Sequence, residues 1–338
     1  MTILYTILGI GFLIVLHELG HFLAAKFFKM RVDEFGVGFP PRLFGKKIGE
    51  TLYSANVLPL GGFVKIHGEM GDETVINDPR SFIGAPPLKR AIVIIAGVVM
   101  NFMTGWFLIS SVFFIGTPTG ILVEDIQAGS PAEVAGIKSG DFIEGFGGSG
   151  EFISYIDSRR GESVELKIRR DGEEKVVSIV PREVTREGEG ALGVVIAEAG
   201  IPPHSLFESL ARGLRTSLEI MVAVLAGLTR IIATIFSEGK LVEGFVGPVG
   251  VFGIASQTMK SGFMFFVQLL GLISLNLAML NVLPFPALDG GRFLFILIEK
   301  IKGSRLSPKV EAAFNAAGFI LLISLILAVT VRDVSRLF

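Results

Sequence analysis

The protein has 338 residues, of which half are hydrophobic and 29 are Phe, and its mean hydropathy is +0.63. This composition excludes an ordinary soluble globular domain and favours a membrane protein. The 31 basic and 32 acidic residues give a net charge of −1, so nothing indicates a nucleic-acid partner. Without Cys there is no disulfide framework and no thiolate metal site, so a bound metal must be held by His and carboxylate ligands.

The first apolar segment, residues 2–25, is long enough to cross a bilayer, and its only acidic, basic or histidine residues are His17, Glu18 and His21. On a helix the two histidines lie on one face and can bind a single metal ion. The H-E-x-x-H pattern predicts a metalloprotease with Glu18 as general base. The alternative is a pair of packing histidines beside a Glu that reaches the membrane surface. The segment lacks the basic start and cleavage site of a signal peptide.

Three further charge-free stretches, residues 91–123, 261–288 and 312–331, predict about four membrane-spanning helices in total. A fifth apolar stretch, 220–236, is interrupted by Arg230, and we interpret 205–236 as amphipathic helices at the membrane interface. Whether 220–236 spans the membrane stays open. The loop 26–90 carries ten Lys or Arg and the loop 287–313 five, which predicts that both are cytoplasmic.

Residues 35–41, 51–57 and 58–65 have the alternation and the Gly and Pro residues of strands and turns. They predict a small sheet beside the first helix. Such a sheet can dip into the membrane and pair with an extended substrate by strand addition. The alternative is a cytoplasmic hairpin that only covers the helix ends.

Residues 117–198 hold most of the charge outside the apolar segments and resemble a PDZ domain. Within it Ser130 is expected to cap a short helix that Gly136 ends, with strands at 163–169 and 175–180. The resemblance implies a peptide-binding loop that contains Gly190, Leu192 and Gly193. This domain is expected to bind a peptide or the C-terminus of another protein. The alternative is that it acts as a plug or size filter.

Two histidines leave a catalytic metal site one ligand short. His67 and His204 are isolated in loops and are interpreted as surface residues. The better candidate is Asp289, which follows a helix broken by Pro284 and Pro286 and would complete a His-His-Asp site with water as fourth ligand. Nearby, Asn276 and Asn281 can reach a kinked substrate backbone. The alternative for Asp289-Gly290-Gly291 is a simple turn after the helix.

Together these motifs resemble the site-2 intramembrane zinc metalloproteases, most closely the bacterial regulator of sigma-E protease group, over almost the whole sequence. The resemblance implies one Zn²⁺ held by His17, His21 and Asp289, with Glu18 as catalytic base. It also implies substrate handling by Asn281, Pro284 and Pro286, and a membrane-dipping β-loop at Gly61 and Gly62. The sequence departs from the family pattern in two places. The stretch 96–98 lacks the family's Pro, although Asn101 and Phe102 are kept. The sequence also has room for one PDZ domain, whereas some relatives have two.

The predicted fold is therefore a polytopic α-helical membrane protein with a membrane-associated β-hairpin and one inserted α+β PDZ domain. The predicted domains are an N-terminal membrane half (1–116), an outward PDZ domain (117–198), a linker with interfacial helices (199–260) and a C-terminal membrane half (261–338).

The resemblance implies proteolysis of single-span membrane proteins in the bacterial inner membrane, with the active site near the cytoplasmic face. Pre-cleaved anti-sigma factors or remnant signal peptides are the expected substrates. The alternatives are a catalytically silent PDZ scaffold and a zinc peptidase of another lineage.

Overall fold

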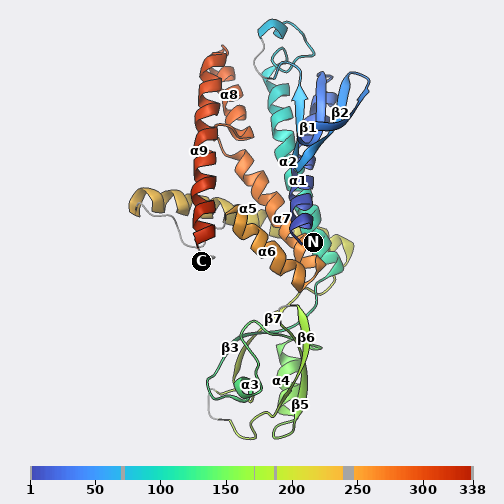
Figure 1. The fold of residues 1–338 in the computed structure, drawn as a ribbon, viewed down its shortest axis with the longest axis vertical. Helices are drawn as coiled ribbons and strands as arrows, with labels where there is room; N and C mark the ends of the chain where they lie inside the picture. The colour runs from blue at the N-terminus through green and yellow to red at the C-terminus, as the bar shows by residue number, and fades with distance from the viewer. Residues whose placement is uncertain (1, 70–72, 171, 186–188, 239–246, 336–338) are drawn as a thin grey trace. The chain divides into compact units, whose positions relative to one another are not determined.

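The computed structural model describes residues 2–69, 73–170, 172–185, 189–238 and 247–335 (Figure 1). The protein divides into two compact units. Unit 1 comprises Met1–Ile109, Gly213–Ser256 and Val267–Phe338, and unit 2 comprises Ser110–Arg212 and Gln257–Phe266.

Four helices among the described residues are long and apolar enough to cross a membrane. They are α1 (Thr2–Phe27), α2 (Pro87–Ile115), α7 (Phe263–Val282) and α9 (Pro308–Ser335). The four predicted membrane-spanning segments are thus confirmed by length and composition. The helix α2 is continuous through Val98, where the resemblance leads one to expect a proline, as is usual for a helix without an interior proline.

The remaining long helices are α5 (Leu206–Glu238), α6 (Pro248–Ser261) and α8 (Asp289–Lys302). The helix α5 covers the segment interpreted as interfacial, and it is not among the four candidate spans. Its exposed apolar residues include Leu214, Leu218, Val222 and Leu225, which recur at helical spacing as an amphipathic surface helix requires.

The strands β1 (Val32–Ile48) and β2 (Thr51–Ile66) form an antiparallel pair in which each long strand folds back on itself. Phe35 pairs with Val64 on one side and with Tyr53 on the other, so the first half of β1 lies between the two halves of β2. The second half of β2 is therefore an edge of the sheet. A short 3₁₀ turn, η1 (Glu73–Val75), follows.

The edge formed by the second half of β2 lies against α1. A Cβ added at Gly11 would lie 2.5 Å from the Pro59 carbonyl oxygen, and one added at Gly62 would lie 3.1 Å from Val15 Cγ2. Small residues at these positions let helix and strand approach closely. The sheet is thereby fixed beside the segment of α1 that carries His17.

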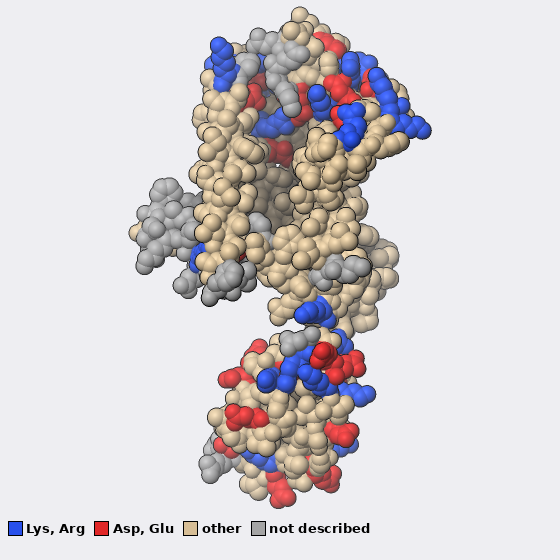
Figure 2. Space-filling model, in the orientation of Figure 1, with Lys and Arg blue, Asp and Glu red and all other residues tan. Residues whose placement is uncertain are grey.

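Charged residues gather at the end of unit 1 that carries the hairpin, and an almost charge-free belt adjoins it (Figure 2). At this end Lys26 Nζ lies 3.2 Å from Glu50 Oε1, and Arg80 also pairs with Glu50. Hydrogen bonds from Arg80 and Lys26 lower the pKa of the Glu50 carboxyl. The pair with Lys26 joins the turn between β1 and β2 to the end of α1, and the pair with Arg80 joins it to the segment after η1.

Unit 2 contains an antiparallel five-stranded sheet in the order β6-β5-β4-β3-β7. The strands and helices are β3 (Gly120–Ile126), α3 (Pro131–Val134), β4 (Phe142–Glu144), α4 (Ser149–Asp157), β5 (Val164–Arg170), β6 (Glu173–Ile179) and β7 (Val194–Ala199). Ile121, Ile143, Leu166 and Phe152 contribute to its core. Ser130 accepts a hydrogen bond from the Glu133 amide, which confirms the predicted helix cap.

Candidate metal centre

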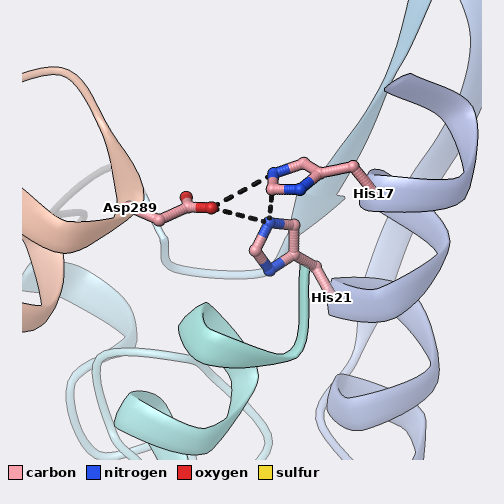
Figure 3. A group of neighbouring side chains, drawn as sticks. All are labelled: His17, His21 and Asp289. Carbon is pink, nitrogen blue, oxygen red and sulfur yellow. Dashed lines mark hydrogen bonds and ion pairs between the residues drawn. The ribbon is translucent and has the colours of Figure 1, made fainter. Parts of the chain in front are cut away.

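His17 and His21 project from one face of α1 toward Asp289, the first residue of α8 (Figure 3). Asp289 Oδ2 lies 3.1 Å from His17 Nε2 and 3.5 Å from His21 Nε2, and the two imidazole nitrogens are 3.1 Å apart. Both histidines are buried and Asp289 is nearly so. One ligand atom from each residue lies within 4.8 Å of the others, so the three converge on a single point.

The space between these side chains fits a zinc ion. Asp289 Oδ2 is buried and receives no hydrogen bond of acceptable geometry from the described residues. On the facing helix α2, a Cβ added at Gly97 would lie 2.3 Å from His21 Nε2 and 2.8 Å from His17 Cε1. Glycine therefore keeps the place beside the imidazoles free. Two imidazoles and one carboxylate form a donor set of the kind found in catalytic zinc sites with three protein ligands.

Two partners hold the imidazole rings from behind. His21 Nδ1 lies 2.8 Å from the Val93 carbonyl oxygen, which can only accept, so Nδ1 donates and Nε2 keeps its lone pair for a metal. Asn101 places its side-chain amide 3.1 Å from His17 Nδ1.

For His17 Nε2 to be free to bind a metal as well, the side-chain amide of Asn101 must be rotated by about 180° so that its oxygen faces His17 Nδ1. In the present orientation Nδ2 faces the ring while Oδ1 is buried without a donor. Exchanging the two atoms lets Oδ1 accept from His17 Nδ1–H and leaves Nε2 free to bind a metal. The Asn101 backbone oxygen also accepts from Ser274 Oγ over 2.8 Å. In the sequence Asn101 stands out only through the family resemblance, although a polar side chain inside a span is itself a functional signal.

Glu18 lies beside the metal cluster and contacts the edge of the sheet. The Val64 backbone amide donates a hydrogen bond to Glu18 Oε2 over 3.1 Å. Because this amide points away from the partner strand, the edge of β2 faces the side of α1 that carries Glu18. The predicted sheet edge and the candidate base thus lie together.

The predicted substrate residues near Asp289 lie at the end of α7 and in the bend that follows it. Asn281 is in the last turn of α7, and Pro284 and Pro286 lie in the bend before α8. The Asn276 amide instead donates to the Leu272 carbonyl of its own helix over 2.9 Å. Gly290 and Gly291 pack so closely on the bend that a Cβ at either would meet a backbone oxygen within 2.3 Å.

The helix α8 is anchored by ion pairs around a cavity of about 340 Å³. Arg292 Nη1 lies 2.7 Å from Glu69 Oε1, and Arg90 Nη2 lies 2.6 Å from Glu299 Oε1. Burial opposes ionisation of Arg292, yet the Glu69 and Asp289 carboxylates raise its pKa above the ordinary value. These pairs join α8 to α2 and to the segment after β2, and so help to fix Asp289.

The other predicted residues lie away from the metal cluster. His67 lies 3.4 Å from Asp33 and 3.6 Å from Asp78, and His204 lies 3.7 Å from Glu208. In unit 2, Leu192 is buried in the core, and its carbonyl accepts from the Ala132 amide over 3.1 Å. The neighbouring Gly190 and Gly193 form the turn before β7, and their role in peptide binding stays a prediction.

Comparison with known proteins agrees with this geometry. The model of peptidase family M50 matches residues 5–325. A Clostridium acetobutylicum protein that is provisionally named a zinc metalloprotease is 34% identical over 98% of this sequence and 97% of its own.

Two further relatives carry functional names. The regulator of sigma-W protease RasP of Bacillus subtilis is 26% identical over 100% of this sequence and 99% of its own. The chloroplastic membrane metalloprotease ARASP of Arabidopsis thaliana is 29% identical over 95% of this sequence and 76% of its own.

The chain belongs to peptidase family M50, the site-2 proteases. It is therefore a zinc metallopeptidase, and its four apolar helices together with the RasP relatives indicate a bacterial membrane protein. The family membership confirms the predicted enzyme class and cofactor.

Proposed function

We propose that this protein hydrolyses peptide bonds within the membrane segments of single-span proteins, with His17, His21 and Asp289 as zinc ligands and Glu18 as catalytic base. The observation that carries the proposal is the convergence of His17 and His21, on an apolar helix of membrane-spanning length, with Asp289 of α8 on one point. Buried ionisable groups in such a helix are costly unless they have a function. Hydrolysis at this point acts on substrate inside or at the edge of the bilayer.

A bound zinc ion supplies a Lewis acid that polarises the scissile carbonyl and lowers the pKa of a water molecule to about 7. Glu18 takes one proton from this water as its oxygen bonds to the carbonyl carbon. Glu18 then delivers that proton to the amide nitrogen as the C–N bond breaks, so the products are one carboxylic acid and one amine. Asn101 and the Val93 carbonyl keep both imidazoles in the orientation for metal binding.

The substrate must be unwound, because the backbone hydrogen bonds of a helix keep its peptide bonds from the catalytic groups. We propose that the edge of β2 near Val64 pairs with the unwound segment by strand addition. Gly61 and Gly62 keep this edge close to α1, at the depth of the active site. Asn281 and, after release from its own helix, Asn276 would contact the substrate backbone beside the bend at Pro284 and Pro286.

The basic loops around the hairpin support a cytoplasmic location for the catalytic end of unit 1, with unit 2 outside the cytoplasm. We propose that unit 2 is a PDZ domain that binds a peptide or a protein C-terminus through the turn at Gly190, Leu192 and Gly193. One relative is named a regulator of sigma-W protease. By analogy, pre-cleaved anti-sigma factors are the proposed substrates in regulated intramembrane proteolysis, with remnant signal peptides as a second class.

The test is cleavage of a purified single-span protein in proteoliposomes, with the cut site located by mass spectrometry. Wild type is expected to cut within the apolar segment of the substrate, and Glu18→Gln to leave it intact. Glu165→Gln, which changes a glutamate in unit 2, is the matched control and should retain cleavage. Cuts confined to soluble parts of the substrate would contradict the proposal.

A further inference from the structure

The bend between α7 and α8, residues 283–288, places Asp289 opposite the histidines, and each of its backbone N–H groups has an identifiable partner. Pro284 and Pro286 have no N–H. The Phe285 amide donates to the Leu283 carbonyl over 2.7 Å, and the Leu288 amide donates to the Phe285 carbonyl over 3.2 Å. These two partners lie within the bend itself, and the Leu283 amide donates to the Leu280 carbonyl of α7 over 3.1 Å. The Ala287 amide instead donates over 3.2 Å to the Asn315 side-chain oxygen, which belongs to α9.

Ala287 has a backbone conformation that an L residue adopts reluctantly. Its φ is +70°, in the left-handed region that favours glycine. Because the residue is not glycine, the surrounding structure must hold it there. Two residues further on is Asp289, so the direction of the backbone at Ala287 decides where the carboxylate points.

Helix α9 approaches the bend closely at one place. Gly318 is buried, and a Cβ added there would lie 2.6 Å from the Pro286 carbonyl oxygen. Asn315 is three residues earlier, on the same face of the helix. The absence of a side chain at Gly318 therefore lets α9 come near enough for Asn315 to reach the Ala287 amide. Elsewhere α9 exposes large apolar residues, among them Phe319, Ile320 and Leu327.

We propose that Asn315 is a positioning residue for the metal centre. By accepting the Ala287 N–H, it holds Ala287 in the left-handed conformation and directs Asp289 toward His17 and His21. The inference rests on the proposed role of Asp289 as a zinc ligand. Asn315 does not touch the metal or the substrate, and its effect passes through the backbone of the bend.

The competing explanation is that Asn315 only helps α9 to pack. The two explanations differ at Ala287. If Asn315 acts by holding a left-handed residue, a glycine at 287 removes most of the need for it, because glycine adopts this conformation without steric cost. If Asn315 serves only for helix packing, a glycine at 287 makes no difference.

The experiment measures zinc affinity of the purified full-length protein by competition with a chelator. Asn315→Leu, which has the same number and branching of side-chain heavy atoms and no acceptor, is expected to weaken zinc binding about tenfold or more. Asn315→Asp keeps an acceptor oxygen and should stay near wild type. Adding Ala287→Gly to Asn315→Leu should recover most of the loss. Thr330→Val, a polar-to-apolar change elsewhere on α9, is the matched control and should bind zinc normally.

Substrate cleavage gives a second measurement on the same variants. At saturating zinc the kcat of Asn315→Leu should return toward wild type, which a disrupted fold would not allow. Should Asn315→Leu fail to fold, Asn315→Ala takes its place in the series. Unchanged zinc affinity in the variant without the acceptor, or no recovery from Ala287→Gly, would overturn the inference.

Asp289→Ala separates the failure of this inference from that of the proposed function. If Asp289→Ala loses zinc while Asn315→Leu binds it normally, only the role of Asn315 is wrong. If Asp289→Ala binds zinc as wild type does, the assignment of the ligand itself is wrong.

Discussion

The Val64 backbone amide in β2 donates a hydrogen bond to Glu18 Oε2 on α1 over 3.1 Å. This contact joins the proposed base to the strand edge that is proposed to hold the substrate. A substrate strand that pairs along this edge thus brings its backbone next to Glu18. The same N–H group orients the carboxylate before substrate arrives.

Val64→Pro tests this relationship, because proline removes the N–H and is tolerated on an edge strand. A hydrogen bond to a charged group contributes about 1.5–3 kcal/mol, so kcat/KM should fall at least about tenfold. Zinc content should stay the same. Val64→Ala keeps the N–H and is the control, for which cleavage near the wild-type rate is expected. Equal kcat/KM for Val64→Pro and Val64→Ala would show that the N–H has no catalytic role.

Gly97→Ala should abolish zinc binding, since the added Cβ would lie 2.3 Å from His21 Nε2 and 2.8 Å from His17 Cε1 and so displace the imidazoles. Zinc per protein molecule, measured by atomic absorption, should fall to a small fraction of the wild-type value. The control is Gly253→Ala in α6, where a Cβ meets nothing within 4 Å. Normal zinc content in Gly97→Ala would mean that the metal lies elsewhere.

Asn101→Leu should weaken zinc binding about tenfold, because His17 loses the acceptor that fixes its tautomer. Chelator competition measures the change. Asn101→Asp retains an acceptor oxygen and should stay closer to wild type. Ser274→Ala removes only the hydroxyl that contacts the Asn101 backbone, so it should have a smaller effect. Equal zinc affinity of Asn101→Leu and Asn101→Asp would show that Asn101 does not fix the orientation of His17.

The sequence predicts the parts of the site that depend on local geometry. The spacing of His17 and His21 places both on one face of any helix. The prolines that end α7 indicate Asp289 as a candidate third ligand. Charge-free stretches of membrane length predict the four candidate spans. These inferences need no knowledge of which helix lies beside which.

The contacts that complete the site join residues far apart in the sequence, so local sequence patterns do not predict them. Asn101 approaches His17 from 84 positions away, and Asn315 reaches Ala287 across 28. The space that Gly97 leaves beside the histidines exists only when α1 and α2 are packed together. Likewise, the register shifts of β1 and β2 decide which half of β2 lies at the edge of the sheet.

Removal of zinc should lower the stability of the folded protein, since the metal binds the assembled ligands and the unfolded state lacks them. At a free zinc concentration about 100 times Kd, binding adds about 2.7 kcal/mol to the free energy of unfolding. The thermal midpoint in detergent should therefore rise on adding zinc to the metal-free protein. His17→Ala should show little rise. A rise of the same size in that variant would place the stabilising zinc at another site.

The most direct measurement of the central claim pairs zinc content with cleavage of a reconstituted single-span substrate in three proteins. Wild type should contain one zinc ion per molecule and cleave. Glu18→Gln should retain zinc and not cleave, and Asp289→Ala should lose both zinc and cleavage. Cleavage by Glu18→Gln at the wild-type rate, or full zinc content in Asp289→Ala, would contradict the assigned roles.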